Sequence, residues 1–191
     1  MAYAENVMIN VLKSLYMHLG ASVLLAFLFM FYYMYLRRYG IKGAFNKWLY
    51  KFKSDADFRR TFFLVFYGAM ILFRTLLCRS VYNNPVSNVI GIWGLHDKEG
   101  KLNTESLENL ILFVPFSFLL FYTFKDRFFK QNSMTLIYVM RKSIVIIFGF
   151  SLLIETCQLF MKLGTFQLSD LFYNTLGGLI GGVLYYITAK K

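Results

Sequence analysis

Residues 154–178 read IETCQLFMKLGTFQLSDLFYNTLGG, and this stretch contains the polar residues that decide the fold. Apolar side chains typical of a membrane span surround Glu155, Gln158, Asp170 and Asn174. Polar and ionisable groups are costly in hydrocarbon, so they need partners inside a protein bundle. The stretch therefore predicts two membrane helices that turn polar residues toward protein rather than toward lipid.

The rest of the chain has the same membrane character. Of its 191 residues, 58% are hydrophobic and 20% aromatic, which is more apolar surface than a soluble domain of this length needs. A helix crosses a bilayer with roughly 17–25 residues, and the apolar segments lack the alternation of barrel strands. We expect an all-α, polytopic membrane helix bundle, with a single domain over residues 1–191. Five transmembrane helices are expected, at Ser14–Leu36, Thr61–Cys78, Ser106–Phe124, Ser143–Met161 and Asp170–Thr188.

Lysine and arginine gather on one side of these expected spans. That side has 15 of them, in the segment 37–60, in the segment between the third and fourth spans, and in the C-terminal tail. The positive-inside rule then puts the N-terminus outside and the C-terminus in the cytoplasm, with 37–60 as a basic cytoplasmic loop and 79–105 as an extracytoplasmic loop. The opposite side has five, namely Lys13, Arg79, Lys98, Lys101 and Lys162.

The net charge of +11 bears on the partners of the protein. Basic residues beside membrane spans attract anionic lipid headgroups, so membrane lipids are expected partners. No nucleic-acid recognition module accompanies the charge, so we expect no nucleic-acid partner. Residues 41–53, IKGAFNKWLYKFK, place apolar residues at helical spacing between lysines, which predicts a helix lying on the inner membrane surface.

Two features predict how the helices pack. Pro115 falls in the middle of the third span, where a proline removes a backbone hydrogen bond and helps to shape a cavity in membrane bundles. Gly177 and Gly178, together with Gly181 and Gly182, form two overlapping pairs of small residues four apart. This spacing is typical of closely packed membrane helices.

Polar residues follow one face of each of the last two spans. The spacing in both is four, three and four, which corresponds to a single helical face. The two stripes are Ser151, Glu155, Gln158 and Lys162, and Asp170, Asn174, Gly177 and Gly181.

Arg74 and Asn109 fall at the same expected depth as these stripes, in the outer third of the membrane. A charged residue inside a span costs roughly 2.5–3.5 kcal/mol on insertion scales, so Arg74, Glu155 and Asp170 are expected to pair with one another. A purely structural clamp between the spans is one interpretation of this cluster. The other is an outward-facing polar pocket.

The pocket interpretation gives each residue a role. Arg74 binds an anionic group, Glu155 exchanges a proton, and Asp170 completes the catalytic candidates. Asn109, Gln158 and Asn174 are the substrate-binding candidates. No metal-ligand motif and no cofactor motif is found, so we expect neither a metal nor a cofactor. No histidine lies near Ser151 or Cys157 in the sequence to activate a nucleophile, which leaves enzymatic activity open.

Four quoted segments resemble the VanZ-like family of small bacterial membrane proteins. They are RTLL (74–77), ENLILFVPFSFLL (108–120), SLLIETCQLF (151–160) and SDLFYNTLGGLIGG (169–182). The resemblance covers roughly residues 61 to 186, and the ordered combination is what makes it specific. The motif positions of the family correspond here to the six polar candidates, with Pro115, Gly177 and Gly178 as structural matches.

The resemblance implies a multi-pass protein of the bacterial cell membrane that lowers susceptibility to lipoglycopeptide antibiotics such as teicoplanin. Its implied partners are a lipid-linked cell-wall precursor or the lipoglycopeptide itself, in an oligomeric state that is left open. Family members carry an arginine and further acids before the last span, whereas this chain has Gly164, Gln167 and Ser169 near those positions. Two alternatives are a transporter or lipid-flipping protein and a non-catalytic scaffold or immunity-type factor.

Overall fold

The computed structural model describes residues 2–32, 37–79, 81–96, 100, 102–129 and 134–190. Residues 33–36 of the first expected span, and Lys98, Lys101, Lys130 and Lys191 of the charge distribution, lie outside the described residues. The regular elements are helical, which confirms the all-α expectation. They are α1 (Ala2–Met17), α2 (Leu19–Phe31), α3 (Arg37–Ser54), α4 (Ala56–Leu72), the π-helical η2 (Phe73–Leu77), α5 (Glu105–Thr123), α6 (Lys125–Phe128), α7 (Leu136–Met161) and α8 (Leu168–Ala189).

Four helical stretches are long and apolar enough to cross a membrane, and they match the first four expected spans. The first begins at Ala4 rather than at Ser14, because α1 and α2 follow each other with a single break at His18. The other boundaries shift by a few residues. The four stretches are Ala4–Phe31, Ala56–Leu77, Glu105–Thr123 and Leu136–Met161.

The fifth expected span coincides with α8, which is not among these four stretches. Asp170, Asn174 and four glycines lower its mean hydropathy. These polar and small residues are buried, and α8 packs against α5 and α7 along its length. A fifth transmembrane helix therefore remains a prediction.

Glycines let α8 approach its two neighbours closely. A Cβ added at Gly177 would collide with the carbonyl oxygen of Leu110 in α5, and one added at Gly181 would collide with that of Val114. Gly178 and Gly182 face α7 in the same way, against Ile147 and Ser143. The Ser117 hydroxyl of α5 donates a hydrogen bond of 2.8 Å to the carbonyl oxygen of Gly178.

Aromatic rings hold α2, α3 and α4 together instead. Trp48 of α3 is 7% exposed, and its ring lies 4.9 Å from that of Phe27 in α2 and 5.8 Å from that of Phe62 in α4. Helix α3 covers the predicted helix at 41–53, and a backbone bend at Gly40, with φ 66°, lies near its start. Pro115 lies inside α5 and lines an apolar groove of about 180 Å³ between α1, the start of α2, α4 and α5.

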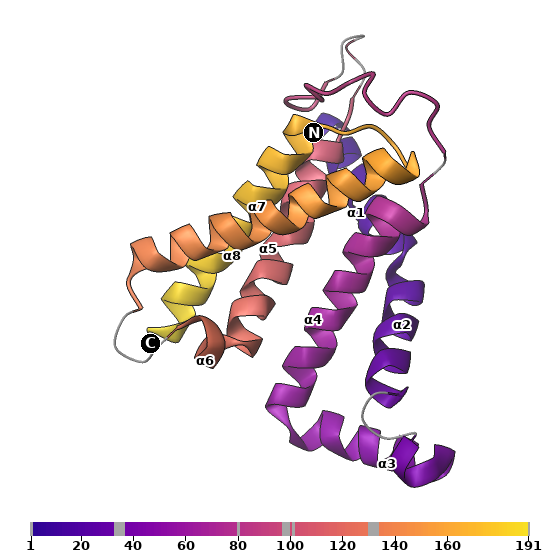
Figure 1. Ribbon diagram of the computed structural model, residues 1–191, viewed down its shortest axis with the longest axis vertical. Coiled ribbons are helices and arrows are strands. Elements are labelled where there is room, and N and C mark those ends of the chain that lie inside the picture. Colours follow the sequence, from indigo (N-terminus) through magenta and orange to yellow (C-terminus); the bar gives the residue numbers. More distant parts are fainter. Residues whose placement is uncertain are drawn as a thin grey trace.

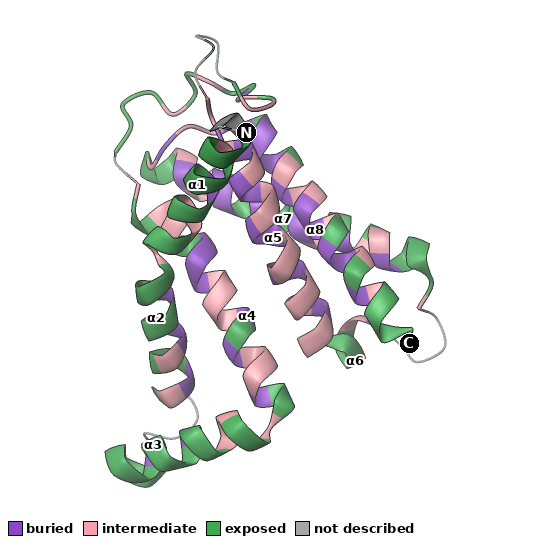
Figure 2. Ribbon diagram, turned by 180° about the vertical axis from the view of Figure 1, so that it is seen from behind, coloured by how far each residue is buried: buried purple, intermediate pink, exposed green. Residues whose placement is uncertain are grey.

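Figure 1 shows the arrangement of these elements. The described residues between η2 and α5 form one end of the molecule, called the loop end below, and the N-terminus lies at that end. Helix α3 lies across the opposite end of α2 and α4. Burial is concentrated where α5, α7 and α8 meet, whereas α3 and α1 are mostly exposed (Figure 2). Which end faces the outside of the cell remains a prediction.

Candidate functional site

The six polar candidates are all placed near the loop end, on four different elements. Arg74 lies on η2, Asn109 on the first turns of α5, Glu155 and Gln158 near the end of α7, and Asp170 and Asn174 at the start of α8. Glu155, Gln158, Asp170 and Asn174 are between 1% and 3% exposed. This confirms that the two stripes face protein, except at Lys162, which caps the end of α7 and is exposed.

The expected ion pairs of Arg74 with Glu155 and Asp170 do not form among the described residues, although Arg74 does interact electrostatically with Asp170. The guanidinium of Arg74 forms its ion pair with Glu108 of α5, with 2.5 Å between Nη2 and Oε2. Its Nε donates to Asn109 Oδ1 at 3.4 Å, and its Nη1 contacts the Ser14 hydroxyl of α1. Because η2 is π-helical, Arg74 does not follow the α-helical spacing on which depth and facing were estimated.

The two buried carboxylates of α7 and α8 find other partners. Glu155 Oε2 accepts a hydrogen bond of 2.9 Å from the backbone N–H of Gln167. Asp170 contacts the side chain of Asn109 and lies within electrostatic range of Arg79. Within the described part of the chain neither carboxylate forms an ion pair. Glu155 and Asp170 are therefore neighbouring acids with hydrogen-bonding rather than ionic partners.

The two amide candidates connect helices. Gln158 Nε2 donates to the carbonyl oxygen of Thr75 at 2.7 Å, which ties α7 to η2. Asn174 Nδ2 donates to the Ser151 hydroxyl at 2.8 Å, which ties α8 to α7. Among the described residues, Gln158 Oε1 and Asn174 Oδ1 have no hydrogen-bond partner. These contacts position the helices, and the substrate-binding role assigned to both amides remains a prediction.

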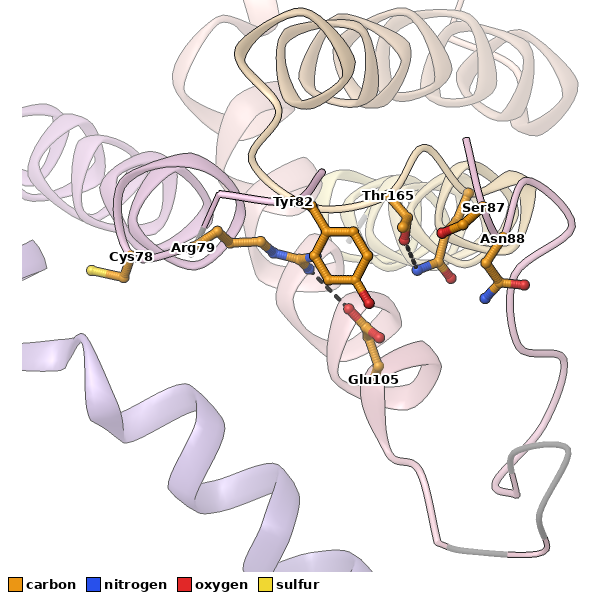
Figure 3. A pocket seen from close by; sticks show the side chains of 9 residues that line it. Cys78, Arg79, Tyr82, Ser87, Asn88, Glu105 and Thr165 are labelled. Carbon is orange, nitrogen blue, oxygen red and sulfur yellow. Dashed lines mark hydrogen bonds and ion pairs between the residues drawn. The ribbon is translucent and has the colours of Figure 1, made fainter. Parts of the chain in front are cut away.

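A polar cavity of about 430 Å³ opens at the loop end (Figure 3). The Arg79 guanidinium and the Glu105 carboxylate form an ion pair across it, with 2.8 Å between Nη2 and Oε1. On another wall, Gln167 Nε2 donates to the Thr165 hydroxyl at 2.8 Å. None of the six polar candidates lines this cavity, whose lining is Cys78, Arg79, Tyr82, Ser87, Asn88, Glu105, Gly164, Thr165 and Gln167.

Backbone hydrogen bonds between two separate segments build this cavity. The segment after η2 runs beside the turn that joins α7 to α8. The N–H of Tyr82 donates to Lys162 O at 2.7 Å, and the N–H of Phe166 donates to Pro85 O at 2.9 Å. The turn begins with Lys162 in the left-handed conformation, and Gly164 has φ 115°. The turn therefore depends on backbone conformations that favour glycine or asparagine.

Gly164 also makes room for Arg79. A Cβ on Gly164 would lie 3.0 Å from Arg79 Nη1, so the guanidinium occupies the space in front of this glycine. Arg79 Nε donates to the carbonyl oxygen of Arg74 at 3.4 Å. The sequence places Arg79 only among the charges of the expected extracytoplasmic loop, whereas the structure places it in the lining of the cavity. The residues that follow Arg79 are typical of a loop, and they gave no signal of this role.

Gln167 connects the cavity to the buried acids. Its side chain lines the cavity, and its backbone N–H holds Glu155. Arg79 and Asp170 interact electrostatically across the same region. An anionic group that enters the cavity would therefore meet the Arg79 guanidinium, which it would share with the Glu105 carboxylate, and hydroxyl and amide donors. The carboxyl groups of Glu155 and Asp170 lie behind Gln167.

The helices of membrane length define a polytopic helical membrane protein, and a polar cavity lies at one end of it. Residues 23–189 match the family model described as VanZ/LLP1, so the chain belongs to this family of bacterial cell membrane proteins. The chain is also similar to Protein VanZ of Enterococcus faecium, with 24% identity over 131 residues, which is 64% of this chain and 74% of that protein. No solved structure matches.

Proposed function

We propose that the protein acts at the outer face of the membrane on a cell-wall or lipid-linked component, and that it lowers susceptibility to lipoglycopeptides such as teicoplanin. Membership of the VanZ/LLP1 family carries this proposal. The polar cavity at the loop end supports it, because the charge distribution of the sequence predicts that this end lies outside the cell.

The geometry supports a different anion-binding residue from the one that the sequence suggested. Arg74 is occupied by the buried Glu108 carboxylate. Arg79 is paired too, with Glu105, but it lines the cavity, its side chain is 21% exposed, and its Nη1 lies beside Gly164. Arg79 is therefore the residue that binds an anionic group of the ligand, such as a phosphate or a carboxylate. Glu155, held by Gln167, is the candidate for proton exchange behind it.

The test is antibiotic susceptibility in a sensitive Gram-positive host. Teicoplanin and vancomycin are compared for wild type, Arg79→Gln and Glu155→Gln at matched membrane levels of folded protein. Lys162→Asn is the control, because it removes one exposed positive charge close to the cavity and asparagine tolerates the left-handed backbone at that position.

The proposal requires that wild type and Lys162→Asn protect against teicoplanin and that Arg79→Gln does not. Loss of protection in Glu155→Gln as well would extend the site to the buried acids. If wild type gives no protection against either drug, the resistance role of the family does not apply to this chain. If Arg79→Gln protects as well as wild type, the cavity is not the site.

A further inference from the structure

A second cavity lies at the end of the molecule opposite to the loop end, between α2 and α3. Its volume is about 560 Å³, and its walls are mostly apolar. Two aromatic residues of α2 form one side of the cavity, and four residues near the start of α3 form the other. The lining residues are Phe27, Phe31, Ile41, Lys42, Phe45 and Asn46.

The walls of this groove are braced by aromatic contacts. The ring of Phe27 lies 4.9 Å from that of Trp48 and 6.4 Å from that of Phe45. Ala44 and Trp48 are buried on the inner side of α3, whereas Ile41 is 74% and Phe45 is 45% exposed. The groove therefore presents exposed apolar surface beside α2, which belongs to a helical stretch long enough to cross a membrane.

The charge around the groove is of one sign. Helix α3 reads RRYGIKGAFNKWLYKFKS and contains no acidic residue. Lys47 donates to the Tyr39 hydroxyl and Lys51 to the Asp55 carboxylate. The ammonium group of Lys42 forms neither an ion pair nor a hydrogen bond with the described residues, and it is the charged group that lines the groove.

We propose that this groove binds an anionic phospholipid of the adjacent leaflet. One acyl chain lies along Phe27, Phe31 and Phe45, and Lys42 binds the phosphate at the level of the lipid headgroups. Asn46 provides an amide donor for the same headgroup. Charge complementarity selects the occupant, because a zwitterionic lipid offers the apolar chain but no net negative charge to a helix that has only basic charges.

The two tryptophans of the chain make the site measurable. Trp48 contacts Phe27 in the groove wall, whereas Trp93 lies at the loop end and is 53% exposed. The full chain with Trp93→Phe, reconstituted into vesicles, leaves Trp48 as the single reporter. Its fluorescence is titrated with acyl-brominated phosphatidylglycerol and with acyl-brominated phosphatidylcholine, which gives the relative binding constant of the two lipids at the groove.

We expect phosphatidylglycerol to be preferred about fivefold, the scale of one basic residue near an anionic bilayer surface. Lys42→Gln removes this preference, and Lys42→Arg retains it. Lys53→Gln is the matched control, because it removes the same charge from the same helix about 16 Å farther along, outside the groove.

Two outcomes would overturn the site. Equal quenching by both lipids in the protein with Lys42 intact would mean that the groove does not select an anionic lipid. An equal loss of preference in Lys42→Gln and Lys53→Gln would mean that α3 attracts anionic lipid through its total charge and not through this groove. Neither result depends on the function proposed for the cavity at the loop end.

Discussion

Helices α5, α7 and α8 pack through glycines and buried polar groups, whereas α2, α3 and α4 pack through aromatic rings. In the first group, Gly177 brings the backbone of α8 against Leu110 of α5, and Asn174 and Ser151 form a hydrogen bond between α8 and α7. In the second group, Trp48 fills the space between three helices. Membrane helices gain no hydrophobic energy by leaving lipid, so close backbone packing and polar contacts give the first group its specificity.

Apart from Arg74, the polar candidates lie in the group that packs through glycines and buried hydrogen bonds. A glycine contact and a buried hydrogen bond both require a short distance between two backbones. The junction between the groups is also polar. Arg74 of η2 pairs with Glu108 of α5, and Thr75 accepts from Gln158 of α7. The comparison predicts that stability is most sensitive at this junction and along the glycines.

Breaking the junction should have the largest effect. Arg74→Gln leaves Glu108 as an unpaired carboxylate whose side chain is 9% exposed. Removing one partner of a buried ion pair typically costs about 3–5 kcal/mol. We expect a loss of this size in the free energy of unfolding in detergent, and a smaller loss in the double variant Arg74→Gln/Glu108→Gln than the two single losses combined.

Arg79→Gln is the matched control for this experiment. Arg79 pairs with Glu105 at 2.8 Å, but the two side chains are 21% and 28% exposed against 12% and 9% for Arg74 and Glu108, so we expect a smaller loss of stability. If the loss of unfolding free energy in the double variant equals the sum of the two single losses, Arg74 and Glu108 do not form a stabilising ion pair. Equal losses for Arg74→Gln and Arg79→Gln would remove the distinction between a buried junction and an open cavity.

The glycine contacts should give the next largest effect. Gly177→Ala places a methyl group against the Leu110 carbonyl oxygen, which is backbone and cannot rotate away. Overpacking of this kind typically costs about 1–3 kcal/mol. Gly149→Ala is the control, because Gly149 lies inside α7 with nothing within 4 Å of an added Cβ. We expect Gly149→Ala to be neutral or slightly stabilising, since alanine favours helix by up to about 1 kcal/mol over glycine.

Thermal unfolding of both variants, followed by size-exclusion chromatography in detergent, measures this difference. If Gly177→Ala and Gly149→Ala change the unfolding temperature by the same amount, α5 and α8 are not closely packed at Gly177. The contrast matters for the sequence interpretation too, because the small-residue spacing predicts close packing at Gly177 and Gly178 but does not identify the partner helix.

Much of the fold could be predicted because it depends on apolar length. Four spans follow from runs of apolar residues, and the basic segment 41–53 follows from helical periodicity. The early start of the first helix could not be predicted, since residues before Ser14 include polar side chains that tolerate a helix without requiring one. In α8, polar residues and glycines lower the mean hydropathy, and the same residues let the helix pack closely against α5 and α7.

For the candidate site, the sequence predicts only which face of each helix carries the buried polar residues. The spacing of Glu155 and Gln158 identifies a buried stripe, because 3.6 residues per turn fix the direction of each side chain. Which side chain pairs with which depends on how the helices are rotated relative to each other. The spacing of residues along a single helix gives no information about that rotation. The sequence therefore predicted Glu155 and Asp170 as the ion-pair partners of Arg74, whereas its partner is Glu108. Arg79 was missed because its role arises from the turn at Gly164, which lies far away in sequence.

The smallest expected effect lies in the aromatic group, at the start of α4. Asp55 caps this helix by accepting hydrogen bonds from the N–H groups of Asp57 and Phe58, and it pairs with Lys51. The Lys51 hydrogen bond first, and then the backbone N–H of Phe58, lower the pKa of Asp55 below its usual 3.8. The ionised carboxylate therefore contributes its stability at pH values above 3.8, and this contribution is lost as the pH falls through the lowered pKa.

Asp55→Asn isolates the charge, because asparagine caps a helix about as well as aspartate but cannot ionise. We expect the unfolding temperature of wild type to exceed that of Asp55→Asn by a few degrees at most near neutral pH, since the carboxylate is exposed and screened by solvent. The difference should shrink toward zero in acid below the lowered pKa. Lys51→Gln should reduce it at neutral pH as well, since it removes the main cause of the shift. A difference that stays constant from neutral pH into acid would show that Asp55 acts as a helix cap alone. The Lys51–Asp55 ion pair would then contribute no stability.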